Sequence, residues 1–511
     1  MRYLLGIDTG TSATKAVLVG EDGLVRSEAS VGYPLDQPRQ GWAEQDPERW
    51  WEAAAAAVRA ALERAGVPAP EVAAIGLSGQ MHGLVILDEA GRILRPAILW
   101  CDQRTDAECA WLTRTVGLEN LYRWTGNAAL PGFTAPKLLW LRRHEPEIYR
   151  RIRTVLLPKD YVRFRLTGET ATDFSDASGT LLLDVAHRRW SDEMRGALDI
   201  PLQWLPRLHE SPQVTGVVSA AAAEVTGVRA GTPVVAGAGD QAAGAVGMGA
   251  VEEGIFLASL GTSGVVFAPT ARPVVRTGSV LHAFCHAVPG RWHLMGVMLS
   301  AGASLRWFRD QLAAGEAARA GKEGIDPYDL LTASAAAVPP GAQGLVFLPY
   351  LLGERTPHPD PAARGAFVGL TLRHTRAHMV RAVLEGIAFG LRDSLDLLGE
   401  AGAAPREVRV SGGGAASGLW RRILADVFGC PVVYPHSSRG PAFGAALLAG
   451  VGAGMYVSVE EACRKTVGAA GREEPRPAVS ARYAACHALY RSLYPLLKDV
   501  MHQLNELAEM K

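Results

Sequence analysis

Two short Gly-Thr-Ser segments, Gly10-Thr11-Ser12 and Gly261-Thr262-Ser263, are well suited to bind an anion. Glycine lets the backbone approach a ligand closely, and successive N–H groups in a tight turn form a concavity for phosphate oxygens. One such segment alone is more often an ordinary β-turn. Because two copies occur in matching contexts, we expect two turns from two domains to face each other and hold one triphosphate. Lys15 is a candidate phosphate contact, although a solvated lysine fits its position equally well.

Two aspartates stand where strands are expected to end. Asp8 lies at the mouth of the first turn. Since like charges repel, a carboxylate beside phosphates needs a cation between them, so Asp8 is predicted to act on Mg²⁺, directly or through water. Asp240 lies in the glycine-rich run Gly237-Ala238-Gly239-Asp240-Gln241 and can accept the proton of a sugar hydroxyl that attacks phosphorus. The alternatives are a turn aspartate for Asp8 and a helix N-cap for Asp240, and capping is compatible with catalysis.

Three further segments carry groups suited to sugar or nucleoside binding. Gln80-Met81-His82-Gly83 joins two apolar segments, and Trp100-Cys101-Asp102-Gln103-Arg104 offers an aromatic face beside hydrogen-bonding groups. A lone histidine is more often structural. Gly412-Gly413-Gly414, between an expected strand at 407–411 and a helix over 420–428, lets a flat nucleoside lie against backbone, but tight turns use glycine anyway.

Two other nucleotide-binding classes are excluded by missing motifs. A GxxxxGK[ST] segment is absent, and no GxGxxG follows a strand correctly. A P-loop NTPase and a Rossmann dehydrogenase are therefore not expected.

The elements that must position these residues are mixed α/β. Each Gly-Thr-Ser segment follows one strand and precedes another, and the two copies lie half a chain apart, which predicts two related domains over 1–247 and 248–511. Gly471–Pro477 is expected to be a loop before a last helix. The expected strands are 3–7, 14–19, 72–77, 83–87, 233–236, 255–260, 264–268 and 407–411, and the expected helices include 50–65 and 481–504.

Composition limits the class of protein. The 511 residues are 48% hydrophobic and 20% charged, and 52 Lys+Arg balance 52 Asp+Glu, which argues against nucleic acid or anionic membrane as partner. The six cysteines form no CxxC pair, the N-terminus lacks a long apolar stretch, and no window reaches about 18 uninterrupted apolar residues. We therefore expect a cytoplasmic protein with small-molecule partners. The oligomeric state stays open, with a homodimer as one candidate.

Together these residues resemble the FGGY family of carbohydrate kinases, which share the sugar kinase/Hsp70/actin fold. The family motifs are Gly6-Ile7-Asp8-Thr9-Gly10-Thr11-Ser12, Leu260-Gly261-Thr262-Ser263-Gly264, Gly412-Gly413-Gly414 with Ser417, and Gly440-Pro441-Ala442-Phe443-Gly444-Ala445-Ala446. Within the family the sequence is similar to bacterial members that phosphorylate D-xylulose. The strings are Gly41-Trp42-Ala43-Glu44-Gln45, Gln80-Met81-His82-Gly83, Pro131-Gly132-Phe133-Thr134-Ala135-Pro136-Lys137, Leu157-Pro158-Lys159-Asp160-Tyr161 and the run 347–358.

The resemblance implies two related actin-like/ribonuclease H-like ATPase domains flanking a central cleft. It implies ATP and Mg²⁺ as cofactors, Asp240 as catalytic base, Asp8 acting through the metal, and Met81 and His82 against the sugar. Trp100, Asp102 and Gln241 are placed in the same sugar site. Gln241 departs from the asparagine that is common in D-xylulose kinases, which leaves the finer sugar contacts open.

Three alternatives stay open at this point. The first is another FGGY kinase, acting on glycerol, gluconate, ribulose or another ketose. The second is an ATP-switched interaction protein of the Hsp70 or actin type, and the third is a sugar sensor without catalysis. Asp8, Asp240 and both Gly-Thr-Ser turns argue against the third.

Overall fold

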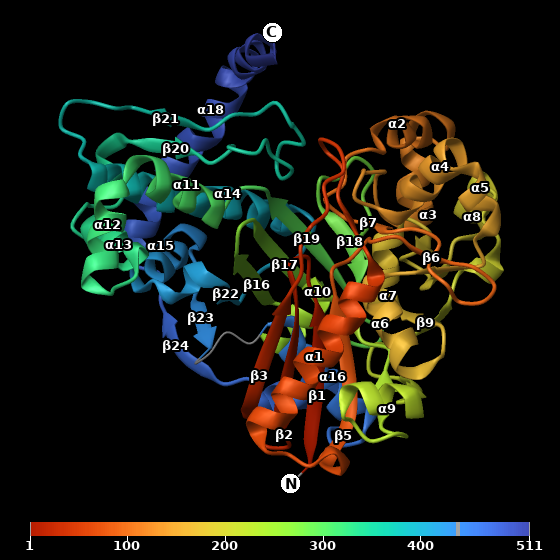
Figure 1. Cartoon of the computed structure of the whole chain (residues 1–511). Coiled ribbons are helices and arrows are strands. Elements are labelled where there is room, and N and C mark those ends of the chain that lie inside the picture. The colour runs from red at the N-terminus through yellow and green to blue at the C-terminus, as the bar shows by residue number, and fades with distance from the viewer. Residues whose placement is uncertain (1, 436–439, 510–511) are drawn as a thin grey trace. The chain divides into compact units, whose positions relative to one another are not determined.

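The computed structural model describes residues 2–435 and 440–509, which form two compact units (Figure 1). Unit 1 comprises Met1–Glu252, Pro269–His293 and Arg439–Gly468, and unit 2 comprises Glu253–Ala268, Leu294–Ser438 and Ala469–Lys511. The units are therefore interleaved along the chain. Two segments that the sequence division placed in the second domain, Pro269–His293 and Arg439–Gly468, cluster with unit 1.

Unit 1 is built on a sheet whose strands run in the order β13-β14-β5-β1-β2-β3, with β15 also paired to β5. β1 is antiparallel to β2 and parallel to β5, so the first Gly-Thr-Ser turn lies at the β1–β2 hairpin. The strands are β1 (Tyr3–Thr9), β2 (Ala13–Gly20), β3 (Val25–Gly32), β5 (Val72–Gly79), β13 (Val214–Val217), β14 (Pro233–Val235) and β15 (Ala238–Gly239).

Helices cover both faces of this sheet. α1 (Pro47–Ala65) shares a core with Leu5 and Ile7, whereas α10 (Asp240–Gly247) and α16 (Pro441–Gly452) share the opposite core with Leu4. α16 lies so close to β1 that a Cβ on Gly6 would stand 1.8 Å from a backbone oxygen of the helix. Only glycine fits there, which explains why this late segment belongs to unit 1 (Figure 1).

The other elements of unit 1 surround the sheet. The helices are α2 (Asp106–Thr115), α3 (Leu118–Thr125), α4 (Thr134–His144), α5 (Pro146–Arg151), α6 (Pro158–Thr167), α7 (Phe174–Ala177), α8 (Asp192–Leu198), α9 (Ala220–Thr226) and α17 (Val459–Thr466). The short strands are β4 (Glu44–Gln45), β6 (Val85–Leu87), β7 (Ala97–Ile98), β8 (Thr154–Leu156), β9 (Ala171–Asp173), β10 (Leu183–Asp184), β11 (Arg189–Trp190), β12 (Arg207–His209) and β18 (His282–Cys285).

Unit 2 repeats the strand pattern, in the order β19-β17-β16-β22-β23-β24. β16 is antiparallel to β17 and parallel to β22, as β1 is to β2 and β5. The predicted duplication of strand, Gly-Thr-Ser turn and return strand is thus present in both units. The strands are β16 (Ile255–Leu260), β17 (Gly264–Thr270), β19 (Trp292–Met298), β20 (Val346–Leu348), β21 (Ala366–Val368), β22 (Glu407–Ser411), β23 (Val432–Pro435) and β24 (Ala469–Glu473).

The helices of unit 2 include the longest in the chain, α18. They are α11 (Gly302–Leu312), α12 (Ala314–Glu323), α13 (Pro327–Ala336), α14 (Arg376–Glu400), α15 (Gly418–Phe428) and α18 (Pro477–Glu509). One sequence prediction is wrong here. The expected loop at 471–477 begins inside β24, which pairs with β23, because backbone pairing at the sheet edge accepts the polar run.

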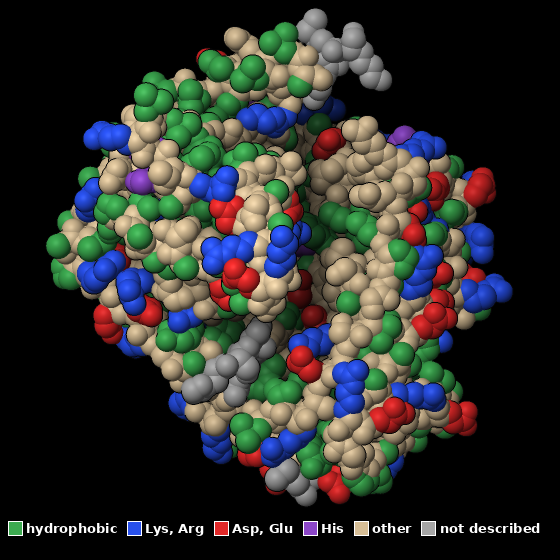
Figure 2. Space-filling view, turned by 60° about the vertical axis from the view of Figure 1, so that its left-hand side comes forward, with side chains coloured by type: hydrophobic (Ala, Val, Ile, Leu, Met, Phe, Trp, Pro, Cys, Tyr) green, Lys and Arg blue, Asp and Glu red, His purple; other side chains and the backbone are tan. Residues whose placement is uncertain are grey.

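The surface agrees with the balanced composition. Figure 2 shows Lys and Arg interspersed with Asp and Glu over the face in view. Within the described residues, the helices lack a stretch long and apolar enough to span a bilayer.

Candidate active site

Three parallel strand ends in unit 1 bring the predicted catalytic residues to one edge of the sheet. In β5, Ser78 is the register partner of Asp8 in β1 and of Ala238 in β15. Asp240 follows β15 by one residue, and Gln80 and Met81 follow β5 directly. The carboxyl ends of these parallel strands therefore bring both aspartates and the start of the Gln80–Gly83 segment to one place.

Asp8 is half-buried and tied into the sheet. The Ser78 hydroxyl donates a hydrogen bond to Asp8 Oδ1, and Lys15 lies directly opposite Asp8 on β2. Burial raises the pKa of Asp8, while the Ser78 hydrogen bond and the Lys15 charge partly oppose that rise. Lys15 forms an ion pair with Glu28, at 2.7 Å, so it contributes positive potential without being dedicated to a phosphate.

Asp240, the candidate general base, has a raised pKa. Burial, and next the negative charge of Asp8, raise the pKa of Asp240 to about 7. Asp240 Oδ1 accepts a 2.8 Å hydrogen bond from the Gln241 N–H in the first turn of α10. The N-cap of α10 is Gly239, without a side-chain cap hydrogen bond, so the N-cap alternative for Asp240 is wrong. Asp240 is instead the first residue of the helix, half-buried at the end of β15.

A buried ionic cluster stands behind Asp240. Lys159, on α6, lies 2.6 Å from Asp160, 3.0 Å from Asp173 and 3.4 Å from Asp176. Ser175 Oγ donates to Asp173 and accepts a 3.1 Å hydrogen bond from Gly239 N–H. Gly239, the residue before Asp240, is thereby fixed to this cluster, which stabilises the backbone position of Asp240.

The first Gly-Thr-Ser turn is oriented by bonds to its carbonyl groups. The Tyr33 hydroxyl donates to Gly10 O at 2.6 Å, and Gln45 Nε2 donates to Thr11 O at 2.7 Å. Thr11 Oγ1 donates to Gln80 Oε1 at 3.1 Å, which joins the turn to the Gln80–Gly83 segment. The Gly10 N–H donates to Ala13 O at 3.0 Å within the turn, whereas Ser12 is exposed.

Met81 packs against Gly239, the residue before Asp240, and His82 packs against Gly179. A Cβ on Gly239 would approach the Met81 Sδ to 3.0 Å, and a Cβ on Gly179 would approach His82 Nδ1 to 2.5 Å. His82 Nδ1 donates to Gly179 O at 2.7 Å, which fixes the ring tautomer. Gln241, beside Asp240, is half-buried.

Trp100 and Asp102 have different roles in the structure. Trp100 is 41% exposed, and its indole N–H donates to Thr11 Oγ1 at 3.0 Å, so its ring lies next to the first turn. Asp102 is fully buried, pairs with Arg104 at 2.7 Å and accepts the Ala43 N–H at 2.6 Å. Its carboxylate is therefore committed to protein groups, which points to support of the Trp100 segment.

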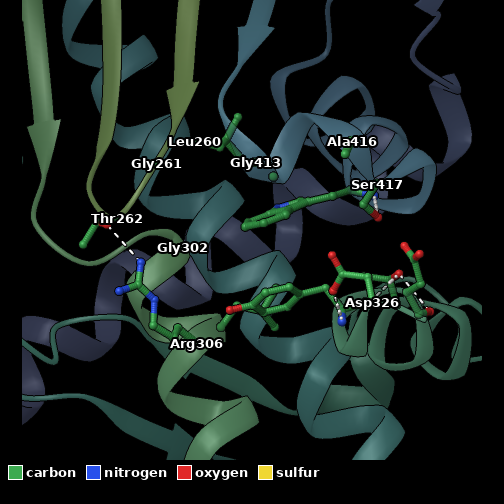
Figure 3. Close-up of a pocket in the computed structure, with 15 residues that line it drawn as sticks. Leu260, Gly261, Thr262, Gly302, Arg306, Asp326, Gly413, Ala416 and Ser417 are labelled. Atoms are coloured by element: carbon green, nitrogen blue, oxygen red, sulfur yellow. Dashed lines mark hydrogen bonds between the residues drawn. The ribbon is translucent and has the colours of Figure 1, made fainter. Parts of the chain in front are cut away.

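Unit 2 contains a cavity of about 370 Å³ beside the second Gly-Thr-Ser turn (Figure 3). Of the predicted nucleotide residues, Gly261, Thr262, Gly413, Gly414 and Ser417 line it. Its other lining residues are Leu260, Gly302, Leu305, Arg306, Asp326, Tyr328, Asp329, Thr332, Ala416 and Trp420. Two aromatic rings beside glycine backbone suit a flat base, and carboxylates suit ribose hydroxyls.

The second turn is braced by the first turn of α11. The Gly302 N–H donates to Gly261 O at 2.9 Å, and the Ala301 N–H donates to Thr262 O at 3.0 Å. Arg306 Nη2 donates to Thr262 Oγ1 at 3.1 Å, and Figure 3 shows its guanidinium reaching the turn from α11. A glycine turn, a helix start and a guanidinium together favour an anion.

Gly414 and Ser417 line the cavity, and Gly412 forms the turn that precedes them. Gly412 has φ 85°, and a Cβ there would approach Leu260 O to 2.5 Å. A Cβ on Gly414 would stand 2.7 Å from the Trp420 ring. Ser417 caps α15 by accepting the Trp420 N–H at 3.3 Å. Ser263 and Gly412 belong to these turns but do not line the cavity.

Two domains of one known protein family match this chain, and each contains one of the Gly-Thr-Ser turns. The N-terminal domain of the FGGY family of carbohydrate kinases matches residues 3–247, and its C-terminal domain matches residues 256–453. The chain belongs to the FGGY family of carbohydrate kinases. It is therefore a phosphotransferase that acts on a sugar, and the FGGY kinases take their phosphoryl group from ATP.

Individual FGGY proteins are similar over most of the chain. The xylulose kinase of Escherichia coli (strain K12) is 46% identical over 458 residues, covering 89% of this chain and 91% of that protein. The xylulose kinase of Bacillus subtilis (strain 168) is 40% identical over 500 residues, with 98% of each chain covered. The crystal structure of a xylulose kinase from Brucella ovis has a TM-score of 0.88 at 39% identity, covering 98% of this chain and 100% of that one. The family match and the structural similarity confirm the predicted sugar kinase/Hsp70/actin fold of this chain.

The site residues that sequence reasoning missed lie on helices. Arg306, Asp326, Tyr328, Asp329 and Thr332 line the cavity, yet none belongs to a glycine-rich motif. The Asp326-Pro327 helix start was a readable signal, because Asp326 accepts the Tyr328 N–H at 2.8 Å as a cap. Nothing local in the sequence pairs Arg306 with Thr262.

Proposed function

We propose that this FGGY kinase transfers the terminal phosphoryl group of ATP to D-xylulose, which yields D-xylulose 5-phosphate. The observation that carries the proposal is the strand edge that brings Asp240 together with Asp8, Met81 and the first Gly-Thr-Ser turn. The pKa of Asp240, which burial raises to about 7, suits a base at that edge. Xylulose kinases 36–46% identical to this chain supply the choice of sugar.

In this proposal the sugar lies in unit 1 against Met81, His82, Trp100 and Gln241, while Asp102 holds the Trp100 segment. Asp240 orients the attacking hydroxyl and accepts its proton. Phosphoryl transfer proceeds through a loose transition state, so a base near neutrality is sufficient, and positioning supplies most of the rate.

The nucleotide is proposed to bind with its adenosine in the unit 2 cavity, against Gly413, Gly414 and Ser417. Thr262 and Arg306 then contact phosphate oxygens, and the Gly10–Ser12 turn acts as the second phosphate contact. FGGY membership supports ATP as donor. The contacts of individual residues with the nucleotide are part of this proposal.

A magnesium ion fits the donor set that unit 1 offers. Among the described residues, no group of three or more His, Cys, Asp or Glu forms a protein-only metal site. Mg²⁺ commonly uses one or two carboxylates and completes its shell with water and phosphate oxygens, which suits Asp8. Bound there, directly or through water, it would neutralise phosphate charge.

Gluconate is the second candidate substrate, because the gluconokinase of Bacillus subtilis (strain 168) is 32% identical over 504 residues. A sugar acid brings a carboxylate that needs a cationic partner in the site. Met81, Trp100 and Gln241 are uncharged, and His82 Nδ1 is already engaged by Gly179 O. These groups suit a neutral ketose better.

The experiment is a coupled ADP-release assay with D-xylulose, D-ribulose, gluconate and glycerol. D-Xylulose is expected to give the highest kcat/KM, with one sugar phosphate formed per ADP. A higher kcat/KM for gluconate would replace the substrate assignment. ATP consumption independent of any sugar would favour the actin-like switch instead.

A further inference from the structure

The backbone at His82 adopts a strained turn. His82 has φ 69°, a region that favours glycine, and Gly83 N–H donates across it to Met81 O at 2.9 Å. A three-residue turn of positive φ is rare in folded proteins and costs free energy. It persists only where surrounding groups hold it.

Two side chains of α4 hold this turn through the His82 carbonyl. Thr134 Oγ1 donates to His82 O at 3.0 Å, and Lys137 Nζ donates to the same oxygen at 2.9 Å. Phe133, one residue before α4, places its ring edge-on to the imidazole, with centroids 4.9 Å apart. The start of α4 therefore fixes both the backbone and the ring of His82.

Lys137 also binds the backbone that packs on the Trp100 segment. Its Nζ donates to Gly132 O at 2.7 Å. A Cβ on Gly132 would stand 2.8 Å from Trp100 O, so the Gly132 backbone packs directly on the Trp100 carbonyl. One ammonium group thus connects the His82 turn with the backbone that supports Trp100.

Lys137 is fully buried, so its amino group carries a desolvation cost that its contacts must offset. Burial lowers the pKa of Lys137 to about 7, and the nearby Asp102 charge opposes part of that fall. A buried cation normally pairs with a carboxylate, whereas the Lys137 ammonium donates to two backbone carbonyls, His82 O and Gly132 O. Methionine would fill similar volume at less desolvation cost but would leave both carbonyls without this donor.

We propose that Lys137 and Thr134 are positioning residues, which hold the His82 turn and the Trp100 segment in the geometry that binds the sugar. The proposal rests on the proposed function in one respect, namely that His82 and Trp100 face the substrate. Neither positioning residue is assigned a contact with the sugar.

The test compares four full-length proteins: the wild type, Thr134→Val, Thr134→Ser and Lys137→Met. Valine matches threonine in shape but lacks the hydroxyl donor, whereas serine keeps it. Calorimetric titration with D-xylulose gives Kd, and steady-state kinetics give KM for ATP. Loss of one neutral hydrogen bond should raise the D-xylulose Kd about fivefold in Thr134→Val, and loss of the ammonium about tenfold or more in Lys137→Met. Thr134→Ser should stay within about twofold of wild type, and KM for ATP should be unchanged in all.

Two results would overturn the proposal. One is a folded Lys137→Met protein with wild-type sugar affinity, and the other is equal affinity in Thr134→Val and Thr134→Ser. If Lys137→Met fails to fold, the valine–serine pair decides, because each change is small. If the wild type binds no D-xylulose, the substrate proposal fails separately, and the same variants are titrated with the sugar that the ADP-release panel selects.

Discussion

Replacing Asp240 by asparagine should abolish turnover and at the same time stabilise the protein at alkaline pH. The pKa of Asp240 is raised from 3.8 to about 7. In the folded state the carboxyl therefore keeps its proton between these values, whereas in the unfolded state it is already ionised. Stability consequently falls as pH rises through this window. Three pKa units correspond to about 4 kcal/mol, and partial solvent access of the carboxyl reduces this to about 2 kcal/mol.

Thermal or urea unfolding of wild type and Asp240→Asn, without nucleotide or Mg²⁺, measures this difference. Near pH 4.5 the two proteins should differ little, and at pH 8 the variant should be more stable by about 2 kcal/mol. Its kcat should fall by a factor of at least about 100, because the base is lost. A difference in stability that does not change between the two pH values would refute the burial argument. Near-normal kcat would remove Asp240 from its role.

Three further substitutions separate the two binding sites. Gly179→Ala places a Cβ 2.5 Å from His82 Nδ1, so KM for the sugar should rise about tenfold while KM for ATP stays unchanged. Gly414→Ala places a Cβ 2.7 Å from the Trp420 ring, so KM for ATP should rise about tenfold while KM for the sugar stays unchanged. Initial-rate kinetics in which both constants change together would contradict the assignment of the two sites. Arg306→Ala should raise KM for ATP about tenfold, and an unchanged value would free Arg306 from the phosphates. Asp8→Ala should lower kcat and raise the Mg²⁺ concentration needed for half-maximal rate, and an unaltered Mg²⁺ titration would refute the metal role.

Local patterns in the sequence were sufficient for the strands and turns that carry the chemistry. β16 and β22 have the predicted bounds, and β1 and β2 extend one or two residues beyond theirs, because apolar runs stopped by glycine and polar residues are read directly from the sequence. The duplication was likewise visible, since the Gly-Thr-Ser turn has the same neighbours in both units.

Long-range packing could not be read in this way. Arg439–Gly468 belongs to unit 1 because Gly6 admits α16 against β1, a contact between residues more than four hundred positions apart. Asp102 looked like a sugar ligand in its own segment, yet its carboxylate is buried against Arg104 and Ala43. The positions of Arg306 and Lys137 likewise depend on which helix reaches which turn.

The most direct test of the proposed phosphoryl transfer is the number of sugar phosphates formed per ADP when the wild-type protein is given ATP, Mg²⁺ and D-xylulose. We predict one phosphorylated sugar for each ADP, at a rate that requires both the sugar and the Asp240 carboxylate. ADP formation that proceeds equally without sugar, or that survives in Asp240→Asn, would contradict it.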